Sequence, residues 1–414
     1  MNHEHDRRRV LLVCRAASTE SVRSAQALAN LQNVDVVTTH ATTSEDLIAT
    51  AVKLRDERGS LERIVTTQET LLEMVAIANE TLGLPGLSVA AVRRTLDKSQ
   101  LKATLQAAGL NTPRYKLIQN FDEMRAFARE IGFPIVLKSL SGSGALATLL
   151  IRSENDLQEA MAQRSSEPLL AEQYITGQEL SIDTITIDSE PRFHSICCYQ
   201  PSILAAVEHP ETQWSCVMPR DMTPYANFIE RGLRAIGALN VGNAMTHMEG
   251  FIDSQGDAWF IDATLRPAGA RIAPMLAFAY DTDPYRAWAR VAVDACFDGP
   301  WQRKYAVGTI FLRASGAGAV QSVAGIEQVK QEFKDLLADA RWPRIDSPKS
   351  LTYTGDGFVT VRHEDTETVQ AALQRVAELV KITYSSNSQP ATETWGSRLQ
   401  NFRELNRPVW DQAN

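Results

Sequence analysis

The sequence predicts a protein of mixed α/β and α+β class, on the strength of three observations. Its 414 residues correspond to about three domains at roughly 150 residues each. Short β-branched runs alternate with helical segments over roughly the first 90 residues, which is typical of a parallel sheet covered on both faces. Farther along, apolar strands flank glycine-containing turns and predict antiparallel hairpins, and from about residue 300 strands and helices follow in mixed order.

In the N-terminal region we expect strands at residues 10–14, 34–38 and 63–67, and helices at 20–30, 46–58 and 69–82. The turn after the first strand reads CRAASTES and contains no glycine. A dinucleotide-binding turn needs glycines at this place, because the backbone must approach the pyrophosphate closely. This region is therefore not expected to bind a dinucleotide.

The central region begins with a helix that Asp97 caps and that ends at Ala108, before Gly109 and Pro113. A helix at 121–131 precedes strands at 135–138 and 146–151, which flank a loop of small residues. Next we expect a helix at 155–163, strands at 169–175 and 180–187 that form a hairpin about Gly177, and a helix at 228–239. A second hairpin joins residues 246–252 to 258–263, and a helix covers 285–294.

The C-terminal region changes in texture, and we place a boundary near Gly299. Strands are expected at 307–312, 316–320, 352–353 and 358–362, with helices at 326–338 and 366–381.

Composition and charge narrow the function classes. Apolar residues make up 44% and charged residues 22% of the chain, which is ordinary globular composition and excludes a disordered or collagen-like chain. The net charge of −8 disfavours nucleic acid and anionic membranes as partners, and no apolar run is long enough to span a bilayer. Five cysteines without C-x-x-C spacing indicate reduced thiols, so we expect a cytoplasmic enzyme without disulfides or zinc.

The loop SLSGSGA follows Lys138 at the end of an apolar strand. Small residues allow backbone N–H groups to surround phosphate oxygens, but an ordinary hairpin tip has the same composition. Gly142, Gly144 and Ala147 fit G-x-G-x-x-A, although a strand and not a helix follows them. Lys98 and Lys138 are compatible with phosphate contacts and equally with solvated positions.

Two predicted hairpins carry acidic residues. Asp262 and Thr264 are two apart and share one face of their strand, and Glu249 can face the same patch from the partner strand. Two carboxylates and a hydroxyl suit Mg²⁺, and Arg266 would add a cation for an oxyanion. An exposed, solvated strand face is the alternative, as it is for Glu172 and Glu179 in the other hairpin.

The order of these features resembles that of the ATP-grasp superfamily over about residues 82–294. The segments that carry the likeness are GLPG, LDKSQLKATLQAAGLNTP, GFPIVLKSLSGSG, LLAEQYITGQELSID, THMEGF and FIDATLRPAGARI. Within the superfamily the chain is most similar to carboxylate–amine ligases of the L-amino acid ligase and carnosine synthase type. VGTIFLRASGAGAVQSVAGIEQV and GDGFVTV resemble the closing lobe of that group.

The resemblance implies an ATP-grasp fold with three parts. Residues 1–95 would be a Rossmann-like pre-ATP-grasp domain and residues 96–299 the ATP-grasp domain, with an ATP lid at about 113–187. Residues 300–414 would be an α+β lobe and tail. ATP and Mg²⁺ would be the cofactors.

The resemblance also assigns roles to residues. Lys98 and Lys138 would bind the nucleotide phosphates, Glu179 the ribose, and Arg266 would stabilise the acyl phosphate. A loop of Ser141, Gly142, Ser143 and Gly144 would close over the γ-phosphate. A hinge of Glu172, Gln173, Tyr174 and Ile175 would contact adenine. Glu249, Asp262 and Thr264 would hold Mg²⁺. Apart from the resemblance, Arg271, Glu208 and Glu211 are candidates to face the acid and amine substrates, and a solvated loop is the alternative for Glu208 and Glu211.

One departure concerns the second metal strand, where the family usually has Glu-x-Asn and this chain has Asp262-x-Thr264. Aspartate is shorter by one bond, and Mg²⁺ tolerates little change in contact distance, so the number of metal ions stays open. The implied reaction joins a small carboxylate to an amine, with amino acids as expected substrates; whether the protein is a homodimer stays open. Alternatives are a biotin-carboxylase-like enzyme, a non-catalytic ATP-binding regulator and a dinucleotide-dependent oxidoreductase.

Overall fold

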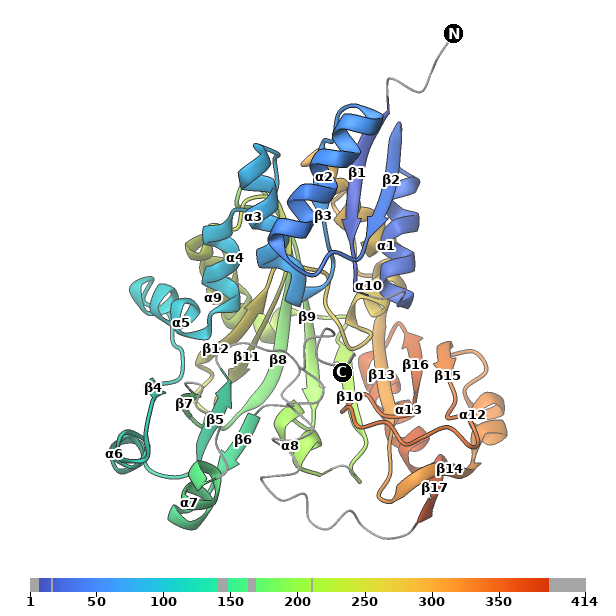
Figure 1. Ribbon diagram of the computed structural model, residues 1–414. Helices are drawn as coiled ribbons and strands as arrows, with labels where there is room; N and C mark the ends of the chain where they lie inside the picture. Colours follow the sequence, from blue (N-terminus) through green and yellow to red (C-terminus); the bar gives the residue numbers. More distant parts are fainter. Residues whose placement is uncertain (1–6, 16–17, 140–147, 163–168, 210, 387–414) are drawn as a thin grey trace.

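The computed structural model describes residues 7–15, 18–139, 148–162, 169–209 and 211–386. Its N-terminal part, at the top of Figure 1, is a three-stranded parallel sheet in the order β2–β1–β3. The strands are β1 (Arg8–Val13), β2 (Val34–Thr39) and β3 (Arg63–Val65), and the helices are α1 (Thr19–Ala29), α2 (Ser44–Arg58), the short η2 (Glu69–Leu71) and α3 (Leu72–Leu82).

The central strand of this sheet is buried on both faces. Val10 and Leu12 belong to a core shared with the middle of the molecule, whereas Leu11 and Val13 pack in a separate core with α2 and α3. Successive side chains of a strand point to opposite faces, so one short apolar run joins the two cores. The expected parallel sheet, covered on both faces, is confirmed.

A helical segment leads to a small sheet at the lower left of Figure 1. Helices α4 (Val89–Leu96) and α5 (Lys98–Ala107) precede β4 (Tyr115–Ile118), α6 (Phe121–Ile131), β5 (Ile135–Ser139), β6 (Thr148–Ile151), α7 (Glu154–Ala162) and β7 (Leu169–Gln173). The strands form an antiparallel sheet in the order β4–β7–β5–β6. The hairpin about the small-residue loop is therefore confirmed, and α4 was not expected.

The largest sheet has eight antiparallel strands in the order β12–β11–β8–β9–β10–β13–β16–β15. Its strands are β8 (Gln178–Ile187), β9 (Glu190–Gln200), β10 (Trp214–Met218), β11 (Ala244–Ile252), β12 (Ala258–Thr264), β13 (Ala306–Leu312), β15 (Leu337–Arg341) and β16 (Gly357–His363). The associated helices are α8 (Ile203–Glu208), η3 (Thr223–Tyr225), α9 (Ala226–Leu239), α10 (Ile272–Tyr280) and α11 (Pro284–Asp294). Because β10 pairs with β13, the sheet continues across the boundary expected near residue 299, and the domain division stays a prediction.

The C-terminal part adds α12 (Ile326–Glu332), α13 (Thr366–Leu379) and a two-stranded sheet of β14 (Ala317–Ala324) and β17 (Lys381–Ser386). The helix expected at 326–338 was too long, because residues 337–341 pair with β16 and form β15. The strand expected at 352–353 was wrong, since these residues lie in a turn and Tyr353 contacts the Trp214 ring edge-on at 5.4 Å.

The hairpin expected about Gly177 was also wrong, because β7 and β8 belong to different sheets. Gly177 lies against the backbone of Ile252, and a Cβ atom there would come within 2.2 Å of the Ile252 carbonyl oxygen. The segment before β8 thus links two sheets and runs close to the backbone at the end of β11. Glu172 and Glu179 are buried on either side of it, and are not on an exposed hairpin face.

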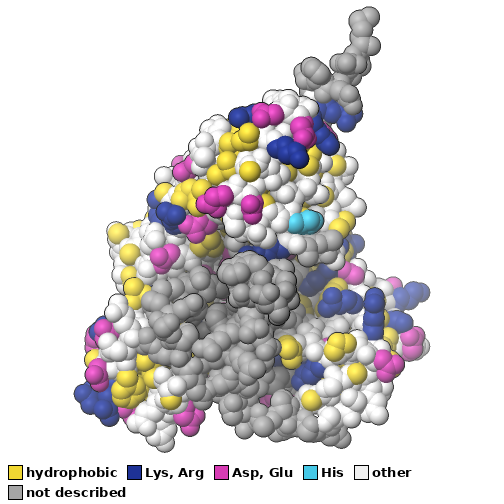
Figure 2. Space-filling view, viewed as in Figure 1, with side chains coloured by type: hydrophobic (Ala, Val, Ile, Leu, Met, Phe, Trp, Pro, Cys, Tyr) yellow, Lys and Arg dark blue, Asp and Glu magenta, His cyan; other side chains and the backbone are white. Residues whose placement is uncertain are grey.

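Charged side chains of both signs are interspersed over the N-terminal part in the space-filling view (Figure 2). Ion pairs also tie the C-terminal part to the centre, as where Asp281 contacts Lys304 and Arg362, both at 3.0 Å. Within the described ranges, none of the helices combines the length and the apolar character that a membrane span requires.

Candidate active site

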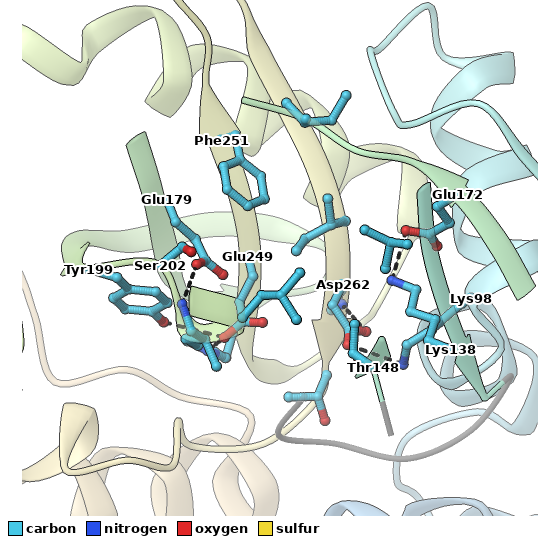
Figure 3. A pocket seen from close by; sticks show the side chains of 18 of the residues that line it. Lys98, Lys138, Thr148, Glu172, Glu179, Tyr199, Ser202, Glu249, Phe251 and Asp262 are labelled. Carbon is cyan, nitrogen blue, oxygen red and sulfur yellow. Dashed lines mark hydrogen bonds and ion pairs between the residues drawn. The ribbon is translucent and has the colours of Figure 1, made fainter. Parts of the chain in front are cut away.

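A cavity of about 200 Å³ lies where the two antiparallel sheets and the N-terminal part meet. Lys138 and Glu172 come from the four-stranded sheet, Glu249 and Asp262 from the eight-stranded sheet, and Glu69 from η2. In Figure 3, Glu172 and the two lysines Lys98 and Lys138 lie on one side of Asp262, while Glu179, Tyr199 and Glu249 lie on the other. We call these the lysine side and the carboxylate side.

The lysine side is built by one helix and two strands. Lys98 and Lys102 stand one turn apart on α5 and point the same way. Lys98 Nζ lies 3.1 Å from Asp262 Oδ2, and Lys102 Nζ lies 3.0 Å from Glu172 Oε1. Lys138 Nζ lies 2.9 Å from Glu172 Oε2, because Lys138 and Glu172 are diagonal neighbours on paired strands. Two lysines thus share one carboxylate.

Burial and charge act in opposite directions on these groups. Burial alone would raise the pKa of Glu172, but Lys102 and Lys138 outweigh it and the pKa is lowered. Burial likewise disfavours the Lys98 ammonium, yet the Asp262 carboxylate keeps the pKa of Lys98 raised. Lys102 is completely buried, and burial lowers the pKa of Lys102 to about 8.

The carboxylate side follows the register of the large sheet. Glu249 lies opposite Asp262, and His247 opposite Thr264, across β11 and β12. The shared face predicted for Glu249, Asp262 and Thr264 is therefore present, and all three line the cavity. Burial and then the charge of Glu249 raise the pKa of Glu179 to about 8, although its Oε2 accepts a hydrogen bond of 2.6 Å from the Ile203 N–H at the start of α8.

His247 connects two carboxylates of this side. Its Nδ1 lies 2.9 Å from Asp183 Oδ1 and its Nε2 lies 3.3 Å from Glu249 Oε1. Burial disfavours the imidazolium, but Asp183 outweighs burial and the pKa of His247 is raised to about 10.

Arg266 lies at the end of the cavity toward the N-terminal part. Its Nη2 and Nε donate to Glu69 Oε2 at 2.7 and 3.2 Å, and its Nη1 donates to the Pro267 carbonyl at 2.8 Å. A strand end and a short helix from distant parts of the sequence thus meet in one ion pair.

The cavity also takes in the other expected nucleotide contacts that the structure describes, namely Gln173, Tyr174 and Ile175. It does not take in Arg271, which pairs with Asp339 and stacks over Phe358 at 4.0 Å. Glu208 is paired with Arg152 at 2.5 Å, and Glu211 is exposed beside His209. The substrate roles of these three residues stay predictions, as does the loop of Ser141, Gly142, Ser143 and Gly144, which lies outside the described residues.

Sequence reasoning missed several residues of the site. Lys102 could have been found from its spacing of four from Lys98 on a helix, and Asp183 from its spacing of two and four from Ser181 and Glu179 on a strand. Glu69 gave no comparable signal, because only the tertiary fold brings η2 to the cavity.

The oxygen donors present fit Mg²⁺. Glu249 and Asp262 face each other, and the Thr264 hydroxyl is buried without a hydrogen-bond partner among the described residues. Three acidic, histidine or cysteine side chains close enough to hold an ion by themselves do not occur in the described ranges. Mg²⁺ is usually held by one or two carboxylates together with substrate phosphates, and this pair of carboxylates beside a lysine cluster suits that arrangement.

We compared the chain with models of known protein families. Residues 103–201 match the ATP-grasp domain model. The chain carries an ATP-grasp domain and has the ATP-grasp fold.

The relatives narrow the likeness further. A crystal structure of an L-amino acid ligase from Bacillus licheniformis superposes with a TM-score of 0.73 at 18% identity, over 92% of this chain and all (100%) of that one. The chain is 24% identical to an alanine–anticapsin ligase of Bacillus subtilis (strain 168) over 90% of its own length and 81% of that protein. It is 21% identical to an L-arginine-specific L-amino acid ligase of Bacillus subtilis, where the match spans 57% of this chain and only 58% of that protein.

Proposed function

We propose that the protein is an ATP-dependent carboxylate–amine ligase that forms an amide bond and releases ADP and phosphate. The observation that carries the proposal is that two lysines, a cross-strand pair of carboxylates and an arginine all line one cavity; they are Lys98, Lys138, Glu249, Asp262 and Arg266. The names of two relatives, an L-arginine-specific L-amino acid ligase and an alanine–anticapsin ligase, support an amino acid as at least one of the two substrates.

In the reaction we infer, an oxygen of the acid substrate attacks the γ-phosphorus of ATP, and the bond to the β–γ bridging oxygen breaks to release ADP. The amine nitrogen then attacks the acyl carbon, phosphate leaves, and the nitrogen loses a proton. Phosphoryl transfer depends mainly on positioning and on neutralising charge. This accounts for a site made of cations and carboxylates.

Each residue has a place in this scheme. Lys98 and Lys138 bind and orient the phosphates, Glu179 faces the ribose, and the stretch from Glu172 to Ile175 contacts adenine. Glu249 and Asp262, with Thr264, would hold Mg²⁺, which when bound supplies a positive charge that neutralises phosphate oxygens. Arg266 would hold the acyl phosphate and the oxyanion that follows, as a guanidinium is well suited to paired oxygens.

The test is a matrix of carboxylic acids against amines, scored by ADP release and by product mass. We expect ADP and an amide product for at least one pair of amino acids. Formation of AMP in place of ADP would exclude the acyl-phosphate route. Lys138→Ala and Asp262→Ala should each abolish most of the turnover, and full activity in either variant would contradict the site assignment.

The same assay separates the alternatives. ADP release that depends on bicarbonate and biotin, but not on amino acids, would identify a biotin-carboxylase-like enzyme. Tight ATP binding without ADP release for any substrate pair would identify a non-catalytic regulator, and NAD(P) binding an oxidoreductase.

A further inference from the structure

A buried chain of hydrogen bonds crosses the carboxylate side beneath Glu249. Asp183 lies directly opposite His247 across β8 and β11, and Asp183 and His247 are only 3% and 8% exposed. Both ring nitrogens face carboxylate oxygens, at 2.9 Å from Asp183 and 3.3 Å from Glu249. A ring N–H donates to a carboxylate oxygen, so His247 joins the two acids through its two ring nitrogens.

The chain ends on one particular oxygen of Glu249. The Tyr199 hydroxyl also donates to Glu249 Oε1, at 3.4 Å. Both hydrogen bonds that the described residues make to this carboxylate therefore reach Oε1, and neither reaches Oε2. In Figure 3 the Tyr199 ring approaches Glu249 from the side away from Asp262.

This asymmetry bears on which cation the site accepts. Mg²⁺ requires near-octahedral geometry with short contacts, whereas Ca²⁺ accepts both oxygens of one carboxylate and a larger coordination number. A carboxylate with one oxygen already engaged by two donors is restricted to binding through the other oxygen.

We propose that His247, anchored by Asp183, is a positioning residue that makes Glu249 a one-oxygen ligand and thereby favours Mg²⁺ over Ca²⁺. The inference rests on the proposed function, because it takes Glu249 as a ligand of the metal that accompanies the nucleotide. It adds a residue outside the set of metal ligands and a reason for metal selectivity.

Two substitutions separate the position of the donor from its charge. The side-chain amide of Gln reaches about as far as Nε2 of histidine, and that of Asn about as far as Nδ1. His247→Gln therefore keeps a donor toward Glu249, whereas His247→Asn keeps a donor toward Asp183 only. Both variants lose the positive charge. The same pair of changes at His194, whose neighbour across β8 and β9 is Thr184 and not Asp183, is the matched control.

The measurement is Mn²⁺ binding to the full-length protein with ADP, followed by the electron paramagnetic resonance signal of free Mn²⁺, with displacement by Mg²⁺ and by Ca²⁺. Loss of an outer hydrogen bond to a metal ligand typically costs 10–100-fold in metal affinity. We expect His247→Asn to weaken Mn²⁺ binding by at least about 10-fold and to reduce the Mg²⁺ preference over Ca²⁺. His247→Gln should stay within about threefold of the wild type in both, as should the His194 variants.

Equal effects of the two His247 variants would overturn the proposal, because charge alone would then explain them. If the wild type binds no Mn²⁺ with ADP, the proposed function fails together with the inference. Tyr199→Phe removes the second donor to the same oxygen without changing a charge, and keeps the test valid if His247→Asn does not fold. It should shift the Mg²⁺ to Ca²⁺ ratio in the same direction, and an unchanged ratio would contradict the proposal.

Discussion

The lysine side and the carboxylate side of the cavity bury charge in opposite ways. On the lysine side, the ammonium groups of Lys98, Lys102 and Lys138 contact two carboxylates among the described residues, those of Glu172 and Asp262, so ammonium groups are in excess there. On the carboxylate side, the His247 imidazole contacts two acids, Asp183 and Glu249, and a third acid, Glu179, has its pKa raised to about 8 by burial and by Glu249.

The difference indicates what each side is suited to bind. An excess of buried ammonium groups favours an anion, such as a phosphate chain, and an excess of carboxylates favours a cation. Because the two sides lie in one cavity, an anion and a dication bound together would neutralise both. The substitutions below test this contrast.

The largest effect is expected on the lysine side. Lys138→Met should lower kcat/KM by about 10²–10³-fold, since in the proposed reaction it removes a positive charge that neutralises charge developing on the transferred phosphoryl group. Lys116 on β4 is an exposed lysine of the same sheet, and Lys116→Met should leave kcat/KM unchanged. Steady-state kinetics with thermal unfolding of both variants provide the measurement, and a loss below tenfold would contradict the assignment.

The same chemical change should affect stability differently on the two sides. Glu172→Gln leaves Lys102 and Lys138 buried without their shared carboxylate, and we expect the free energy of unfolding to fall by about 3 kcal/mol or more. Glu249→Gln keeps an amide oxygen that can accept from His247 and Tyr199, and His247 keeps its contact with Asp183. This variant should therefore change that free energy by about 1 kcal/mol or less. Urea unfolding of both variants at pH 7 measures these changes. A larger fall in the free energy of unfolding for Glu249→Gln than for Glu172→Gln would contradict the contrast between the two sides.

Much of the fold was predictable, because local patterns determine most of its elements. The run of Val10 to Val13 is apolar enough for a buried parallel strand, and Asp97 caps α5 as expected. The failures occurred where tertiary pairing overrides local pattern. The helix expected at 326–338 extended into Leu337 and Ala338, which instead begin β15, a strand that pairs with β16. The stretch around Gly177 looks like a hairpin turn, although its two strands belong to different sheets.

The site divides in the same way. Glu249, Asp262 and Thr264 could be placed together because a hairpin fixes their register. Lys98 and Lys138 were found, but their shared surroundings were not, since only the tertiary fold brings Lys102 of α5 to Glu172 of β7. Glu69 meets Arg266 across 197 positions of sequence, a separation over which periodicity carries no information.

Glu179 should give the carboxylate side a distinct dependence on pH. Its pKa is raised from an ordinary 4.5 to about 8 by burial and by Glu249, so between these values the folded state holds a proton that the unfolded state has released. Rising pH in this window therefore lowers the free energy of unfolding, by up to about 1.4 kcal/mol per pH unit. Urea unfolding from pH 5 to 8 should show a flatter profile for Glu179→Gln, and parallel profiles would rule this out.

Lys102 should give the lysine side the opposite slope in a higher window. Burial lowers the pKa of Lys102 from 10.5 to about 8, so between these values the unfolded state keeps a proton that the folded state has lost. Rising pH then raises the contribution of Lys102 to the free energy of unfolding. Lys102→Met should remove this contribution, so its free energy of unfolding should fall progressively below that of the control Lys116→Met as the pH rises from 8 to 10. A difference between the two variants that stays constant over this range would contradict the prediction.

The smallest effect is expected at Thr264, where stability and binding should separate. Its hydroxyl is buried without a hydrogen-bond partner among the described residues, so Thr264→Val should leave the free energy of unfolding unchanged or raise it by up to about 1 kcal/mol. The same variant removes an oxygen next to Asp262 and should weaken Mn²⁺ binding with ADP by a few fold. Thr264→Asn supplies an amide oxygen and should bind Mn²⁺ more tightly than the valine variant. If both variants match the wild type in Mn²⁺ affinity, position 264 is not a metal ligand and the carboxylates alone define that side of the cavity.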